Sequence, residues 1–200
     1  MSDWKFIVPE ATTNLLDDPS FALADPDTEW AIAGDGGGGE DYTRYTSRAK
    51  VGFSAALSTL GASTYATIYQ TITVTATDYT LSAFVRRAGN TITSSHCRCS
   101  FDSGGSDWDS ITAVGDGWYL CQKTDTATAG ARTFGVICYN ANMLVDAVQL
   151  ENKAYRTTYC DGDQDGCTWN GAPDESTSTR SAMSRAGGRV YDFEDDYSFH

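Results

Sequence analysis

The stretch TIYQTITVTATDYTLSAFVRR, residues 67–87, decides the fold class of this chain. Apolar side chains in each half share one face of an extended backbone: Ile68, Ile72 and Val74 in the first half, Leu81, Ala83 and Val85 in the second. Successive side chains of a strand point to opposite faces, so this spacing buries one face and leaves the other polar. A turn-like segment, residues 76–78, separates the halves. The stretch therefore predicts two consecutive half-buried strands.

The same pattern recurs along the rest of the chain. Further strand candidates are residues 14–16, 29–33, 41–47, 50–57, 91–101, 118–123, 131–140 and 143–150. No segment has the periodicity of a convincing amphipathic helix. Two half-apolar sheets must cover one another, so the sequence predicts an all-β fold, a jelly-roll β-sandwich.

Charge restricts the class of partner. Asp and Glu total 27 against 14 Lys and Arg, which gives a formal net charge of −13. A surface of that sign repels phosphate backbones, so we expect no nucleic-acid binding. The sequence has no basic segment followed by an apolar run at its start and no run of about 18 apolar residues. We therefore expect neither a secretion signal nor a membrane span.

Three parts are distinguished along the chain: an N-terminal segment (1–12), the sandwich (13–152) and an extended, largely irregular C-terminal arm (153–200). After Leu150 no run alternates for long enough to predict another strand, and APDESTSTRSAMSRAGG has the composition of a linker. The arm still carries aromatic residues, namely Tyr155, Tyr159, Trp169, Tyr191, Phe193, Tyr197 and Phe199. Ordering a backbone costs about 1–2 kcal/mol per residue, so we expect other subunits to order this arm during assembly.

Catalysis finds no support among the residues. The chain has two histidines and lacks the G-x-S-x-G and H-E-x-x-H motifs, so we expect no enzymatic activity. Carbohydrate binding is the better hypothesis, because sugars stack on exposed aromatic rings and pair with polar side chains. Trp108, in the turn-rich SGGSDWDS, is the first candidate, and a ring packed against a neighbouring subunit is the alternative. The further candidates are Phe84, Arg86 and Tyr139, whereas Trp30, Trp118 and Phe134 are assigned to the core.

Several strings carry a resemblance to a known group of proteins. TNLLDDPSF, ITVTATDYTLSAFVRRAG, GDGWYLCQKT and LVDAVQLENKAYRTTYCDGDQDGCTWNGAPDESTSTR resemble bacteriophage tail proteins that contain a carbohydrate-binding-module-like jelly roll. The resemblance implies a non-enzymatic virion protein of the tail, baseplate or tail fibre, assembled in the host cytoplasm. Its partners would be other virion proteins, copies of itself and glycans of the host surface. A capsid decoration protein and a free-standing carbohydrate-binding module are the alternatives.

The segment YCDGDQDGCTWNG, residues 159–171, is open to more than one interpretation. Asp161, Asp163 and Asp165 with the following glycine match the first half of a calcium loop, but Ala172 stands where a bidentate glutamate would complete it. A solvated acidic turn without calcium is therefore favoured. The flanking Cys160 and Cys167 are close enough for a disulfide if the loop folds back, and two free thiols are the alternative in a reducing cytoplasm.

Asp146 and the remaining cysteines lie in apolar runs. In LVDAVQL, Asp146 shares a face with apolar residues and needs hydrogen-bond donors or a cation. In carbohydrate-binding jelly rolls a similar aspartate can join an acid of the first strand around calcium, but here that position is Ala22. We therefore favour a hydrogen-bonded structural aspartate. The cysteines of HCRCSF, GWYLCQK and FGVICYN are predicted to fill the core as small hydrophobes.

Overall fold

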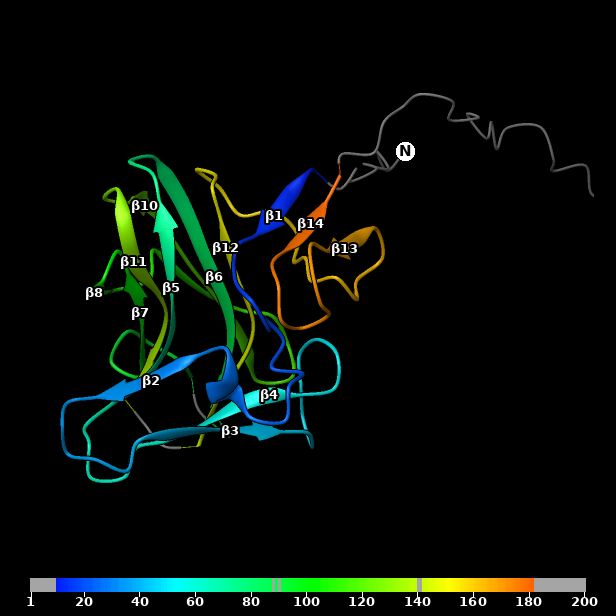
Figure 1. Cartoon of the computed structure of the whole chain (residues 1–200). Helices are drawn as coiled ribbons and strands as arrows, with labels where there is room; N and C mark the ends of the chain where they lie inside the picture. Colours follow the sequence, from blue (N-terminus) through cyan, green and yellow to red (C-terminus); the bar gives the residue numbers. More distant parts are fainter. Residues whose placement is uncertain (1–9, 88, 90, 140–141, 182–200) are drawn as a thin grey trace, which may run out of the picture.

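A computed structural model describes residues 10–87, 89, 91–139 and 142–181, and the structural statements below concern these residues. Two antiparallel sheets face one another (Figure 1). The six-stranded sheet has the order β3 (Asp41–Tyr45), β4 (Ala55–Thr59), β12 (Met143–Glu151), β6 (Asp78–Arg87), β10 (Trp118–Thr126), β9 (Ser110–Ala113). The five-stranded sheet has the order β2 (Ala31–Gly34), β5 (Ala66–Val74), β11 (Gly130–Cys138), β7 (Cys97–Phe101), β8 (Gly104–Ser106). The predicted all-β sandwich is confirmed.

The stretch that decides the fold class crosses between the two sheets. Its first half forms β5 in the five-stranded sheet and its second half forms β6 in the six-stranded sheet. Ile68, Leu81 and Val85 are fully buried and belong to one cluster between the sheets. Burying both apolar faces against each other supplies the main driving force of the fold, at about 25 cal/mol for each Å² removed from water.

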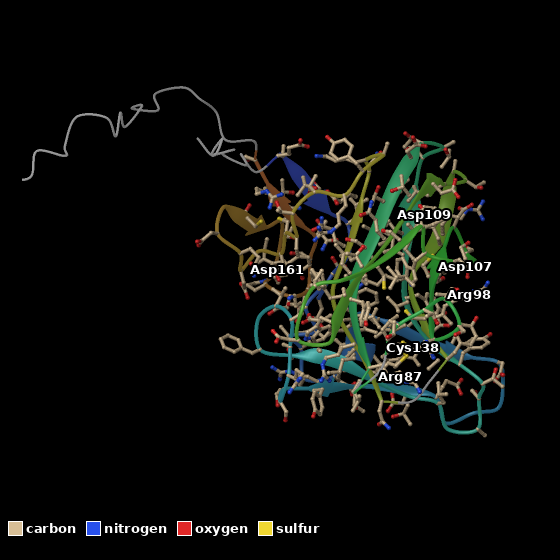
Figure 2. The ribbon with its side chains drawn as sticks, turned by 180° about the vertical axis from the view of Figure 1, so that it is seen from behind. Arg87, Arg98, Asp107, Asp109, Cys138 and Asp161 are labelled. Carbon is tan, nitrogen blue, oxygen red and sulfur yellow. The ribbon has the colours of Figure 1, made fainter. Side chains whose placement is uncertain are left out.

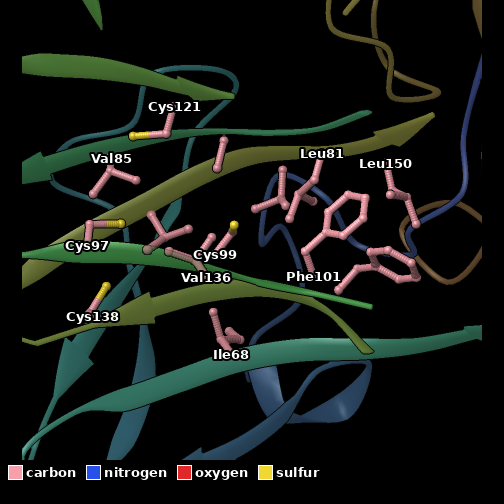
Figure 3. Packing of buried hydrophobic residues seen from close by; sticks show 14 of the residues in the cluster. Ile68, Leu81, Val85, Cys97, Cys99, Phe101, Cys121, Val136, Cys138 and Leu150 are labelled. Atoms are coloured by element: carbon pink, nitrogen blue, oxygen red, sulfur yellow. The ribbon is translucent and has the colours of Figure 1, made fainter. Parts of the chain in front are cut away.

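Cysteines occupy the middle of this core. Cys97, Cys99, Cys121 and Cys138 are all fully buried, and Figure 3 shows them among Val85 and Val136. Burial raises the pKa of the Cys99 thiol to about 12, so this side chain stays neutral near pH 7. The prediction that these cysteines act as small core hydrophobes is confirmed, as is the assignment of Trp30, Trp118 and Phe134 to the interior.

Trp108 lies in the core, so the expectation of an exposed ring is wrong. Its side chain is 7% exposed, and its Nε1–H donates to Cys97 Sγ at 3.4 Å. The glycine-rich turn before it forms β8, which pairs with β7, and the backbone N–H of Asp109 bonds to the Gln122 carbonyl at 2.8 Å. These two attachments hold the intervening tryptophan against the sandwich, and its ring has no free face for a sugar.

A third, small sheet joins the two ends of the described chain. It has the order β1 (Thr12–Asn14), β14 (Ser178–Arg180), β13 (Cys167–Trp169), and a single 3-10 turn, η1 (Pro26–Thr28), lies between β1 and β2. The sequence predicted no strand after Leu150. Strands of three residues are too short for alternation to reveal them, and they form here because β1 supplies the missing edge.

The segment after β12 is ordered by its own sandwich. Glu151 is almost fully buried, and its carboxylate accepts hydrogen bonds from the hydroxyls of Thr12 and Thr157 and, at 3.0 Å, from the backbone N–H of Thr157. Arg180 donates to the carbonyls of Glu10 and Thr158 at 3.1 Å each. The expectation that other subunits order the arm is therefore wrong for residues 153–181, and its part from 182 to 200 lies outside the described residues.

Candidate functional site

The loop between β3 and β4, residues 46–54, is held by Asp146. Asp146 Oδ2 accepts from the backbone N–H groups of Lys50 (2.5 Å) and Val51 (2.9 Å), and Oδ1 accepts from Ala147 N–H at 2.6 Å. A bulge in β12 makes this possible, since the pairing register shifts after Asp146 and Ala147 has φ = 48°. Burial raises the pKa of Asp146 to about 7, and the three N–H donors act against that rise. Asp146 is thus a hydrogen-bonded aspartate that positions the loop.

One side of this loop borders a small cavity, here called the Phe53 hollow, with a volume of about 280 Å³. Phe53 stands at its rim with 88% of its surface exposed, directly after Gly52, whose φ of 61° turns the chain outward. Arg44, Asp161 and Gln164 supply polar groups to the same cavity. An exposed ring beside converging carboxylate, amide and guanidinium groups is suited to a sugar, which offers an apolar face and a ring of hydroxyls.

The aspartates of the DGDQDG segment do not gather around a common point. Asp161 is buried and accepts from Asp163 N–H at 3.0 Å, while the Asp163 carboxylate accepts from Trp169 Nε1–H at 3.1 Å and Asp165 is exposed. Desolvation raises the pKa of Asp161. In the described ranges no three His, Cys, Asp or Glu side chains are arranged to hold a metal ion. Hydrogen bonds engage Asp161 and Asp163 within the turn, and Asp146 is engaged by its N–H donors. Calcium at these aspartates stays a prediction.

An earlier part of the loop, residues 48–50, borders a second cavity of about 570 Å³, here called the basic hollow. It is lined by Arg48, Lys50, Arg86, Asp116 and Trp118 among others. Arg86 Nε–H donates to the Asp116 carbonyl at 3.1 Å. Next to it, the Phe84 ring lies 5.6 Å from Lys50 Nζ and 5.8 Å from Arg156 Cζ. The structure thus brings Phe84 and Arg86 to one region, but two cations already cover the ring.

Tyr139 lies in a different place, at the far end of the five-stranded sheet. It lines a cleft of about 300 Å³ with Arg98 and Asp107, and its ring centroid is 5.7 Å from that of Tyr65. Arg98 Nε and Asp107 Oδ1 are 2.6 Å apart, and this ion pair lowers the pKa of Asp107. Figure 2 shows this pair on the side of the sandwich opposite Asp161. The predicted carbohydrate residues therefore do not form one site.

Cys160 and Cys167 are both buried free thiols. Burial raises the pKa of Cys160 to about 12, and a hydrogen bond with the Cys167 thiol adds to the rise. The two sulfurs are thus neighbours, and a disulfide between them stays a prediction. Within the described part of the chain, no helix has the length and apolar character needed to cross a membrane.

Comparison with known proteins finds similar structures but no matching sequence family. No protein family and no curated protein sequence matches the chain. The CBM22-1 xylan-binding domain from Paenibacillus barcinonensis is similar to 76% of this chain, over its own full length, at 14% identity and a TM-score of 0.47. The enzymatically active domain of tailspike protein 4 from bacteriophage CBA120 is similar to 68% of this chain, over 21% of its own length, at 14% identity and a TM-score of 0.46. Likeness at this level does not extend to a ligand, so function rests on the site itself.

Proposed function

We propose that the chain is a non-enzymatic carbohydrate-binding protein, and that a glycan binds at the Phe53 hollow. The observation that carries the proposal is the exposed Phe53 ring beside a cavity that presents Arg44, Asp161 and Gln164. A phenylalanine with 88% of its surface in water contributes almost nothing to the core, and stacking on a sugar gives it a use. The loop that carries it is fixed through Asp146, so little conformational entropy is lost on binding.

Phe53→Ala is expected to weaken glycan binding about tenfold, which corresponds to about 1.4 kcal/mol. The wild-type chain is first screened on a panel of immobilised neutral and acidic polysaccharides, and the affinity for the best ligand is then measured by calorimetry. The matched control is Tyr155→Ala, because Tyr155 is 52% exposed but lies away from the hollow. The ligands should also be recovered at unchanged length, because the sequence lacks the G-x-S-x-G and H-E-x-x-H motifs.

Two outcomes would contradict this proposal. Equal losses in the Phe53 and Tyr155 variants would show that exposed rings bind the matrix without a defined site. Shortening of the glycan that stops on Asp161→Asn or Asp163→Asn would show that the carboxylates of the hollow are catalytic.

We further propose that this binding protein is a virion component of a tailed bacteriophage, at the tail, baseplate or fibre. The support is the resemblance of residues 144–180, together with the glycan chemistry of the hollow, which suits attachment to a host surface. A particle reconstruction is expected to show the chain in several copies at the tail, with the Phe53 hollow facing outward. A position on the capsid, or absence from purified particles, would overturn the assignment.

A further inference from the structure

The basic hollow concentrates positive charge on a strongly acidic chain. Arg48, Lys50 and Arg86 line it, and Arg156 reaches the Phe84 ring beside it. Arg86 lies on the outer face of the six-stranded sheet, because the alternate residues Leu81, Ala83 and Val85 of β6 face the core. With a net charge of −13, a random surface patch would be acidic, so four cations at one place need an explanation.

Among the described residues, this cluster forms no ion pair with the chain's own carboxylates. The ion pairs of the described residues use Arg98, Lys123, Arg132 and Lys153, and none uses the four cations of the cluster. Asp116 lines the hollow, but Arg86 bonds to its backbone carbonyl. Glu151 acts on Arg156 electrostatically, yet its oxygens accept hydrogen bonds from Thr12 and Thr157. Arg48, Lys50 and Arg86 therefore keep unused hydrogen-bonding capacity toward the hollow.

Lys50 and Arg86 are also held in place before any ligand arrives. The backbone of Lys50 is bonded to the buried Asp146, and its ammonium group rests over Phe84. The Arg86 guanidinium is oriented by its Nε–H bond, which leaves its terminal nitrogens to bind in a fork. A guanidinium fork matches the two oxygens of a carboxylate or of a sulfate group. Fixed donors of this kind bind an oxyanion with little loss of side-chain freedom.

We propose that the basic hollow binds the oxyanion of an acidic polysaccharide, either a uronate carboxylate or a sulfate ester. The identification of the ligand as a glycan rests on the proposed function of the Phe53 hollow. Lys50 lines one hollow and Gly52 the other, and two residues of chain span at most about 7 Å. One polysaccharide that crosses the loop can therefore place a sugar against Phe53 and a charged group among the cations.

The test compares wild type with the double variant Arg48→Gln/Arg86→Gln. The probes are polygalacturonate, dextran sulfate and neutral dextran, and the matched control is Arg132→Gln, whose partner is Asp102. Wild type and control should bind at least one acidic polymer tenfold or more tightly than neutral dextran, and the double variant should lose that preference. The preferred polymer distinguishes carboxylate from sulfate. Binding should weaken from 20 to 200 mM NaCl in wild type and less so in the double variant.

Other outcomes separate this proposal from the proposed function. A roughly tenfold loss of affinity for acidic and neutral polymers alike in Phe53→Ala, with the acidic preference lost only in the double variant, supports both. A further outcome is that no polysaccharide binds, but inorganic sulfate raises the melting temperature of wild type by more than it raises that of the double variant. In that case the anion site stands and the glycan function fails. Equal binding of acidic and neutral polymers by wild type, or unchanged binding by a folded double variant, overturns the proposal. Binding of duplex DNA as tightly as of the acidic polymers also overturns it.

Discussion

Replacing Trp108 with alanine is expected to lower the free energy of unfolding by about 3–5 kcal/mol. The indole is 7% exposed and packs in the main core, so its removal leaves a cavity that rigid strands cannot fill. It also removes the N–H donated to Cys97 Sγ. Phe53→Ala also removes an aromatic ring, but from an exposed turn. It is expected to change the free energy of unfolding by no more than about 0.5 kcal/mol.

Urea denaturation followed by far-ultraviolet circular dichroism measures both variants. Trp108→Phe serves as an intermediate case, because it keeps an aromatic ring and loses only part of the volume. We expect the order wild type, Trp108→Phe, Trp108→Ala in midpoint concentration. A Trp108→Ala protein that is as stable as wild type but no longer binds glycan would show that the indole is at the surface and that Phe53 is not the binding ring.

The alternation of apolar residues was sufficient to predict the sandwich. It identifies which side chains of β5 and β6 face the core, and Ile68 and Leu81 are indeed buried there. It could not predict that these consecutive strands belong to different sheets, since both cases give the same pattern. Nor could it place Trp108. Local composition indicated a turn, while the pairing of β7 with β8 decides where the ring goes. Tertiary attachment overrides local turn signals at this position.

The candidate site was only partly predictable for a related reason. Asp146 was expected to be hydrogen-bonded, because a carboxylate in an apolar row must find donors, and it finds them on the loop. Phe53 was concealed inside the predicted strand 50–57, whereas β4 begins at Ala55. The glycine before Phe53 was the one signal of a turn. The loop and the DGDQDG segment line one cavity although they are more than 100 positions apart in sequence, which no local pattern encodes.

A second buried carboxylate, Asp18, makes stability depend on pH. Asp18 is fully buried, its Oδ1 accepts from Ala22 N–H at 2.6 Å, and its Oδ2 has no hydrogen-bond partner. Desolvation raises its pKa from 3.8 to about 7; the bonds from Ala22 and Leu23 act against that rise, and so, more weakly, does the charge of Arg44. The native protein therefore holds a proton on Asp18 up to about pH 7, while the unfolded chain releases it near pH 4.

The native state binds a proton on Asp18 that the unfolded chain releases. Its contribution to the free energy of unfolding is therefore complete below the pKa of the unfolded chain, and it is lost as the pH rises through the pKa of the folded protein. Asp18→Asn keeps an oxygen for Ala22 N–H, tolerates the φ of 39°, and removes the charge. It should stabilise the protein on the order of 4 kcal/mol at pH 8, from about three pKa units at 1.36 kcal/mol each. The gain should shrink toward pH 5.

Thermal melts of wild type, Asp18→Asn and the exposed control Asp165→Asn between pH 5 and pH 8.5 measure this difference. Taking the difference between wild type and variant cancels the titration of the other carboxylates, Asp146 included, because both proteins share them. A stability difference that is the same at every pH would mean that Asp18 does not titrate in this range and that Arg44 compensates its charge. A difference that grows with pH and levels off above pH 7 is the signature of a carboxylate that folding protonates.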